Sequence, residues 1–187
     1  MLARAEAEKA TGEAILTAAL AAFSRDTFDR VTLKDIADAS GVTVQTVIRR
    51  FGSKENLFSV LAERETARVL ASREAPSESD LSAALAVLID HYETDGETVL
   101  NFLRQEHLFE PIRKIVEQGR RVHRDWVERY CHEVLDGTRG SRRARRLHAA
   151  IAATDLGTWK LLRLDLGLER SEVLAVMNEL LLGLRRE

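Results

Sequence analysis

Residues 32–54 read TLKDIADASGVTVQTVIRRFGSK, and this stretch decides the fold. Thr32 stands three residues before Asp35, so its hydroxyl can accept from a first-turn amide while the carboxylate favours the positive helix end. Gly41 suits the left-handed residue that ends a helix, and Thr43 can cap a second one. The stretch therefore predicts two short helices joined by a tight turn, the layout of a helix-turn-helix.

The two predicted helices have an inner and an outer face. The first covers residues 33–40, and the second ends near Phe51. Small side chains at Ala37 and Ala39 allow close approach of the helices. The side chains that can fill the space between them are Ile36, Val42, Val47 and Phe51. The side chains left outward around the second helix are Thr43, Gln45, Thr46, Arg49 and Arg50.

Charge supports the same outward face. Between Gly41 and Lys54 there are three basic residues and no acidic one, whereas the whole chain has a formal charge of −2. A sequence pI near 6.2 argues against coating of nucleic acid by the whole surface, so DNA affinity has to come from a local patch. On charge alone a basic run is as readily a solvated face, but caps, glycine and spacing favour a DNA-facing surface.

A further helix is predicted before this motif, over residues 13–25. A set of residues at one fixed spacing begins in that helix and extends to the start of the helix that follows the motif. The set is Ile15, Ala18 or Ala19, Phe23, Val31-Thr32, Asp35-Ile36-Ala37, Gly41-Val42-Thr43, Thr46-Val47 and Phe51-Gly52-Ser53-Lys54-Glu55-Asn56-Leu57-Phe58. Residues 12–61 in this way resemble the N-terminal domain of TetR-family transcriptional regulators. The chain departs from that pattern at Ile48, where the family most often has a Tyr that reaches the DNA backbone.

The resemblance implies a homodimer that binds a palindromic double-stranded DNA operator, with two recognition helices on half-sites roughly 34–36 Å apart. We expect base-edge contacts from Gln45, Thr46 and Arg49, because Gln can pair with adenine and Arg with guanine. By resemblance, Lys54 contacts a phosphate, with a solvated lysine as the alternative. The remaining candidates are Thr32, Lys34, Thr43, Val44 and Arg50, with Ile48 left open between core and base contact.

Length and composition favour an ordinary soluble protein of one compact unit or two small ones, and the helical patterns predict an all-α fold. The chain has 187 residues, 45% apolar and 31% charged, enough for a real core. We expect a three-helix helix-turn-helix domain over residues 1–53, a linking helix over residues 54–76 that Pro76 stops, and a helical ligand-binding and dimerisation bundle over residues 77–187. Ser77 and Asp80 mark that boundary as a possible cap.

Three helix patterns follow in the predicted bundle. The stripe Leu81 to Tyr92 predicts a short helix, with a sharp turn at residues 94–97 that contain Gly96. Pro111 suits the start of a long helix that runs to about Leu135. Arg142, Arg143, Arg145 and Arg146 then begin another helix, and a solvated rim is preferred there to a second DNA contact.

The last two predicted helices are apolar over more than one stripe. The first carries Leu147, Ile151, Trp159, Leu161 and Leu162, and the second carries Val173, Leu174, Val176, Met177, Leu180, Leu181 and Leu184. Such helices need two neighbours, so we expect a two-fold, four-helix interface between two copies. The alternative is a better buried monomer core.

An effector pocket is expected because TetR-like proteins usually have one, and the bundle holds aromatic and polar candidates to line it. They are Phe102, Trp126, Tyr130, Thr154, Asp155, Thr158 and Trp159. The alternatives are an ordinary aromatic core and, for the three polar residues, a dimer seam. A DNA-binding helical dimer without an effector stays open as the competing function.

Enzymatic chemistry finds little support in the sequence. The five His residues make no i, i+4 pair, no metal-ligand spacing or phosphate-binding glycine loop is present, and we expect no catalytic residue, metal or cofactor. Cys131 has no second cysteine to pair with and is expected to be an inert buried thiol. Without a membrane-spanning segment or signal peptide, the expected location is cytoplasmic.

Overall fold

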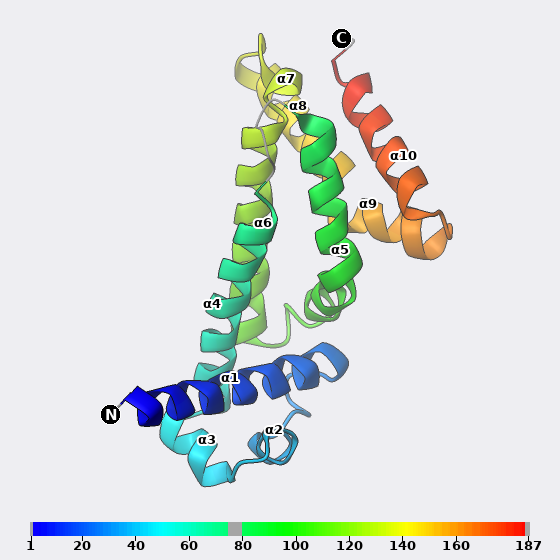
Figure 1. Cartoon of the computed structure of the whole chain (residues 1–187). Coiled ribbons are helices and arrows are strands. Elements are labelled where there is room, and N and C mark those ends of the chain that lie inside the picture. Colours follow the sequence, from blue (N-terminus) through cyan, green and yellow to red (C-terminus); the bar gives the residue numbers. More distant parts are fainter. Residues whose placement is uncertain (1, 75–79, 186–187) are drawn as a thin grey trace. The chain divides into compact units, whose positions relative to one another are not determined.

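The computed structural model describes residues 2–74 and 80–185, and these residues form helices without strands. The helices are α1 (Leu2–Arg25), α2 (Leu33–Ser40), α3 (Val44–Phe51), α4 (Lys54–Ser72), α5 (Leu81–Leu103), α6 (Glu110–Tyr130), α7 (His132–Leu135), α8 (Gly140–Thr154), α9 (Leu156–Lys160), the π-helical segment η1 (Leu161–Asp165) and α10 (Arg170–Gly183) (Figure 1). The expectation of an all-α fold with an N-terminal helix-turn-helix is confirmed.

The chain divides into two compact units. The first runs to Ala67 and includes Glu97–Val116, and the second consists of Arg68–Gly96 and the chain from Glu117 onward. The expected stop at Pro76 and the cap at Ser77 lie outside the described residues. The domain boundaries drawn from the sequence therefore stay predictions.

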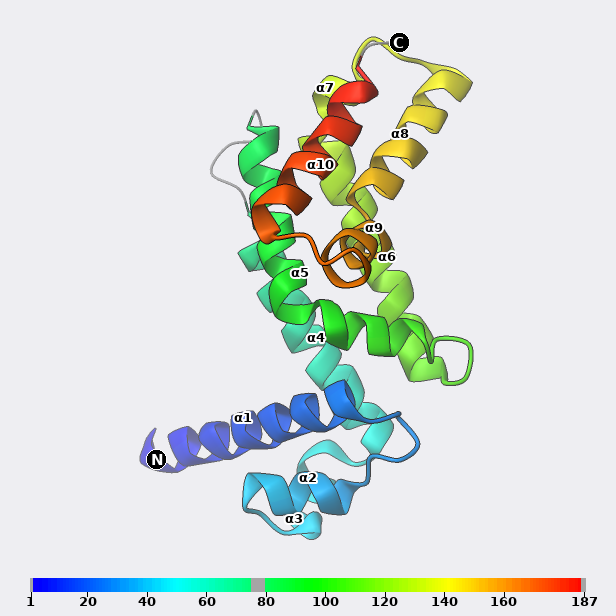
Figure 2. The ribbon, with the colours of Figure 1, turned by 90° about the vertical axis from the view of Figure 1, so that its right-hand side faces the viewer.

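The first unit holds the helix-turn-helix against α1, which lies across α2 and α3 (Figures 1 and 2). Its core contains Ile15, Phe23, Ile36, Val47 and other buried apolar side chains. Five phenylalanines pack ring to ring at its centre, with centroids 5.0–5.7 Å apart: Phe23, Phe28, Phe58, Phe102 and Phe109. This burial gives two short helices a tertiary support that they would lack in isolation.

Side chains at the end of α5 complete the end of α1. Asn101 donates its amide to the carbonyl oxygens of Phe23 and Asp26, at 3.1 and 3.2 Å. The buried side chain of Gln105 accepts the Phe28 amide at 2.8 Å and donates to the Asn101 carbonyl at 3.0 Å. The last carbonyl groups of a helix have no hydrogen-bond donor within the helix, so the side-chain amide of Asn101 supplies donors to the end of α1.

The prediction of a short helix and a sharp turn at residues 94–97 is wrong, because α5 continues through these residues. The helix continues to Leu103 because the polar side chains there are satisfied on its surface: Thr94 donates to the Asp90 carbonyl, and Asp95 pairs with Arg68 at 2.7 Å. Gly96 is not a turn residue. A Cβ at Gly96 would lie 2.7 Å from the Trp159 ring, so the glycine allows this indole to approach the helix.

Two further helices end earlier than the sequence predicts. The long helix that was expected to reach Leu135 is interrupted at Cys131 and resumes as α7. The apolar helix that was expected to carry both Leu147 and Leu162 is broken at Asp155, whose backbone is extended. Asp155 instead caps α9 by accepting the Gly157 amide at 2.7 Å.

In the second unit α8 packs beside α10 (Figure 2), with Leu147, Ala150, Val173, Met177 and Leu181 buried. Cys131 is fully buried, and burial raises the pKa of its thiol to about 12, which keeps the sulfur protonated and unreactive. None of the helices in the described residues is long and apolar enough to cross a bilayer.

Candidate nucleic-acid interface

The first turn of α2 is fixed by a reciprocal cap. The Thr32 hydroxyl accepts the Asp35 amide at 3.2 Å, and the Asp35 carboxylate accepts the Thr32 amide at 3.0 Å. Hydrogen bonds from Thr32 hold the pKa of this carboxyl below its usual value. The predicted cap is confirmed. Thr32 thus has a structural task at the surface where a DNA contact was also expected from it.

The turn between α2 and α3 has the geometry that its glycine predicts. Gly41 has φ +70°, and the Val42 amide reaches back to the Ala37 carbonyl at 3.1 Å. Thr43 then caps α3 by accepting the Thr46 amide at 3.2 Å. A left-handed residue favours glycine, so this position fixes the angle at which α3 leaves α2.

α3 divides into an anchored side and an exposed side. Val47 and Phe51 are buried in the core of the first unit, and Val44 packs partly against it. Gln45 and Arg49 lie one turn apart and are exposed, and the structure records no hydrogen bond or ion pair for either within the residues it describes. Helix α3 therefore presents a Gln and an Arg outward, as the sequence predicts, with both side chains free for base edges.

Ile48 belongs to the exposed side. It is 40% exposed, and it lies between Gln45 and Arg49 in sequence, one turn after Val44. Ile48 is therefore not a core residue, which was one of the two alternatives that the sequence left open. An exposed isoleucine at this position can offer an apolar surface to a thymine methyl group but no hydrogen bond to a phosphate.

Arg50 folds back toward α1. A Cβ at Gly12 of α1 would lie 2.5 Å from a terminal nitrogen of the Arg50 guanidinium, so the arginine side chain packs against α1 at this glycine. A groove of about 680 Å³ opens beside it, lined by Ala7, Glu8, Thr11, Thr46, Arg49 and Arg50. Arg50 is thus placed at the α1 side of α3, beside a groove that Arg49 also lines.

Lys54 is held by the protein itself. Its ammonium donates to the carbonyl oxygens of Phe28 and Val31, at 2.8 and 2.9 Å, and lies 4.7 Å from the centroid of the Phe28 ring. An ammonium at the positive end of α4 is unfavourable by itself, and these carbonyls offset that repulsion. The sequence could not indicate this role, because the partners lie 23 and 26 residues upstream.

Lys34 lies in the first turn of α2. Its ammonium pairs with Asp38 at 2.6 Å, one turn later in α2, and the Asp38 carboxylate raises the pKa of the lysine. Both side chains are well exposed, so the pair is readily exchanged for a phosphate. Among the residues expected to contact DNA, Lys34, Thr43, Gln45, Ile48 and Arg49 are exposed and Thr46 is half-buried.

This geometry matches a family signature. The profile described as "Bacterial regulatory proteins, tetR family" matches residues 15–61, from the middle of α1 to α4. Residues 15–61 are a tetR-family domain. A comparison with curated protein sequences finds no match.

Solved structures share the fold of the chain. A transcriptional regulator from Pseudomonas aeruginosa PAO1 superposes with a TM-score of 0.72 at 17% identity, over 93% of this chain and 89% of that one. A tetR-family transcriptional regulator from Streptomyces coelicolor gives 0.71 at 18% identity, over 94% and 81%. A complex of SmeT with triclosan gives 0.67 at 20% identity, over 93% and 91%.

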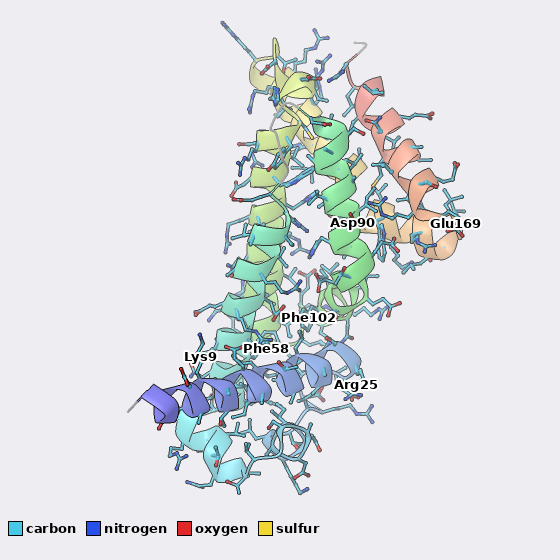
Figure 3. All side chains as sticks on the ribbon, in the orientation of Figure 1. Lys9, Arg25, Phe58, Asp90, Phe102 and Glu169 are labelled. Atoms are coloured by element: carbon cyan, nitrogen blue, oxygen red, sulfur yellow. The ribbon has the colours of Figure 1, made fainter. Side chains whose placement is uncertain are left out.

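The residues expected to line an effector pocket do not all lie together. Phe102 belongs to the first unit, where its ring packs against Phe58 with centroids 5.7 Å apart (Figure 3). The other six lie in the second unit: Trp126, Tyr130, Thr154, Asp155, Thr158 and Trp159. The aromatic ones are buried, with the Trp126 and Tyr130 centroids 5.3 Å apart.

Three of these six candidates have structural tasks near the break between α8 and α9. Asp155 caps α9, the Thr158 hydroxyl donates to the Ala152 carbonyl at 2.6 Å, and the Trp159 indole donates to Glu93 at 2.9 Å. Sequence reasoning missed Arg73, His91, Tyr92 and His123, which are buried in the same unit. A buried arginine and two buried histidines have no local sequence signal, because their burial depends on helices far away in the chain.

Proposed function

We propose that this tetR-family chain is a transcriptional repressor that binds a palindromic operator as a homodimer and is released by a small-molecule effector. The observation that carries the proposal is the exposed side of α3, where Gln45 and Arg49 lie one turn apart on a helix anchored by Val47 and Phe51. A rigid, capped helix with an outward amide and guanidinium suits the major groove, where both groups discriminate between base pairs.

Dimerisation is supported by leucines that the single chain leaves exposed. Among the described residues, four of the seven exposed large apolar side chains lie between residues 161 and 180: Leu161, Leu164, Leu166 and Leu180. Such apolar exposure favours an interface, and a second copy is the partner that the two-fold symmetry of a palindrome requires. Two α3 helices related in this way would lie on half-sites roughly 34 Å apart.

Release by an effector is supported by the second unit. It buries two tryptophans, two tyrosines and several polar side chains, which is an unusual interior for a purely structural bundle. SmeT, which has a similar fold, is described in a complex with triclosan. The competing function is a helical dimer that binds DNA without an effector, and it predicts the same operator with no response to ligands.

Selection of bound sequences from random duplex tests the proposal. The full chain is incubated at near-physiological salt, and the recovered duplexes are sequenced and rebound in competition with scrambled DNA. We expect an inverted repeat that binds about a thousandfold or more tighter than the scrambled duplex. Recovery without any palindromic preference rules the repressor out. Repeating the rebinding with candidate ligands distinguishes a ligand-released repressor from the effector-free alternative.

A further inference from the structure

The second unit contains a connected group of buried polar side chains from four parts of the chain. The Arg73 guanidinium, just after α4, lies 5.6 Å from the centroid of the Tyr92 ring in α5. The Tyr92 hydroxyl donates to the Thr154 carbonyl at the end of α8, at 3.0 Å, and the Thr154 hydroxyl lies 3.2 Å from Nε2 of His123 in α6. We call Arg73, Tyr92, His123, Trp126 and Thr154 the buried polar cluster.

Three atoms of the buried polar cluster have no hydrogen-bond partner among residues 2–74 and 80–185: Arg73 Nε, His123 Nδ1 and Trp126 Nε1. Their side chains are only 8%, 7% and 5% exposed. Buried polar atoms are normally paired, and an unpaired one opposes folding. Three of them in one connected group indicate that something outside the chain completes the group.

Hydrogen bonding fixes which of these atoms donate. A carbonyl can only accept, so the Thr154 hydroxyl donates to the Ala150 carbonyl, at 2.8 Å, and its oxygen accepts from Nε2–H of His123. Nδ1 of His123 is then a bare lone pair, because burial lowers the pKa of this imidazole to about 4 and keeps it neutral. The cluster thus offers two donors, on Arg73 and Trp126, and one acceptor, on His123.

Among residues 2–74 and 80–185, no carboxylate pairs with Arg73 alone. Burial lowers its pKa, yet a guanidinium stays protonated at neutral pH. The carboxylate whose charge raises the pKa of Arg73 is that of Asp95. This carboxylate already pairs with Arg68 at 2.7 Å and lies 3.0 Å from Nδ1 of His91. A buried cation without its own anion favours an anionic ligand.

The surroundings of the cluster are aromatic. The His123 and Trp126 rings are nearly parallel, at 8° with centroids 6.1 Å apart, and the Tyr92 and Trp159 rings lie 6.0 Å apart. These rings pack on one another beside the unpaired polar atoms, and such aromatic surroundings favour a ligand that itself carries a planar ring.

We propose that the buried polar cluster binds a small hydroxylated aromatic carboxylic acid. Its carboxylate accepts from Arg73 and Trp126, its hydroxyl donates to His123, and its ring lies among the aromatic side chains. This inference rests on the proposed effector response and names the chemical class of the effector.

The test is a titration of the full chain with the three isomeric hydroxybenzoates, followed by tryptophan fluorescence and calorimetry. We expect at least one isomer to bind below roughly 1 mM. Its methyl ester, which lacks the charge, and benzoate, which lacks the hydroxyl, should each bind about tenfold or more weakly. Absence of binding by all three acids, or equal binding of acid and ester, overturns the proposal.

Variants locate the site. Arg73→Met should weaken binding about tenfold to a hundredfold, and Arg73→Lys, which keeps the charge, should weaken it less. The matched control Arg143→Met removes an exposed arginine of α8 and should leave affinity unchanged. Equal losses in Arg73→Met and Arg143→Met would contradict the assignment. If Arg73→Met does not fold, the comparison of acid and ester on the native chain decides.

Operator binding is measured in parallel, so that the two proposals fail separately. A chain that selects a palindrome but binds none of the acids keeps the proposed function and loses this inference. A chain that binds an acid through Arg73 but selects no palindrome keeps the site and loses the repressor.

Discussion

The ammonium of Lys54, in the first turn of α4, donates to the backbone carbonyl of Phe28, 2.8 Å away in the connection between α1 and α2. A second bond, to Val31, ties the same connection at 2.9 Å. One side chain thereby holds the loop that precedes α2 against the helix that follows α3. The helix-turn-helix is enclosed between these two points, so its position depends on a residue that the sequence predicted to contact a phosphate or to be solvated.

Replacing Lys54 should therefore lower stability in the absence of DNA. Lys54→Met leaves two carbonyls without their donor, and we expect the free energy of unfolding to fall by about 1–3 kcal/mol. Urea unfolding of the full chain measures the change. Lys34→Met, which removes an exposed lysine, is the control and should leave the unfolding midpoint unchanged. Unaltered stability of Lys54→Met with a salt dependence of DNA binding flattened by about one unit would instead assign Lys54 to a phosphate.

Gln45 and Arg49 should determine sequence preference. Gln45→Ala and Arg49→Ala are each expected to relax the preference at one base pair of each half-site by about 1–3 kcal/mol, since each removes a base-edge contact. Competition binding with operators mutated one base pair at a time measures this. Arg104→Ala removes another exposed arginine and should reduce no positional preference. A uniform loss over all duplexes in Gln45→Ala would speak against base recognition.

Gly96 should tolerate no side chain. Gly96→Ala places a methyl group 2.7 Å from the Trp159 ring, and the resulting shift should cost about 1–3 kcal/mol of stability. Gly119→Ala is the matched control, because a Cβ there meets nothing within 4 Å in the middle of α6. It should stabilise by roughly 0.5–1 kcal/mol through helix propensity. Thermal unfolding of both variants checks the pair, and similar melting temperatures would refute the close approach.

Acid should destabilise the second unit through His123. Folding lowers the pKa of this imidazole from 6.5 to about 4, chiefly by burial and next by the charge of Arg73. Between these values the unfolded chain binds the proton and the folded chain does not. The stabilisation is present above about pH 6.5 and is lost as the pH falls toward 4, by up to about 3 kcal/mol.

Unfolding at pH 7.5 and pH 5 measures this loss in the native chain and in His123→Gln. The variant should lose less stability on acidification, while the exposed control His148→Gln should behave as the native chain. Burial also lowers the pKa of His91, but all three proteins share that contribution. A pH response of His123→Gln equal to that of the native chain would mean that His123 titrates normally.

Leu180 should be needed for assembly. It is 47% exposed on α10, and Leu180→Arg is expected to convert the dimer into a monomer, because it places a charge in an apolar interface. Sedimentation at micromolar concentration reports the mass. Leu108→Arg alters a leucine that is 61% exposed in the first unit, and it should leave the dimer intact. A native chain that is itself a monomer would remove the basis for a palindromic operator.

Local sequence signals predicted the helix-turn-helix, because caps and turns depend on residues a few positions apart. Thr32, Gly41 and Thr43 each have the geometry expected of them. Gly96 was misread for the opposite reason. Its packing partner Trp159 is 63 residues away, and nothing within one turn of the glycine distinguishes close packing from a bend.

The candidate site likewise contains residues that local sequence signals predicted and residues that they could not predict. The outward position of Gln45 and Arg49 follows from helical periodicity, which fixes which side chains face the core. The hydrogen bonds of Lys54 to backbone carbonyls and the burial of Arg73 do not follow from this periodicity, since both depend on contacts between segments that are distant in sequence. Asp155 had a usable signal, because an Asp two residues before a glycine can cap a new helix.

The amides of Asn101 and Gln105 have a consequence for anyone who transplants this DNA-reading head onto another regulator. Cutting the gene after Ala67 removes both side chains together with the aromatic rings of Phe102 and Phe109. It would leave the end of α1 uncapped and the Phe28 amide without its acceptor. A transplantable head therefore needs the segment from Glu97 to Val116 as well, supplied in the same chain or as a second polypeptide.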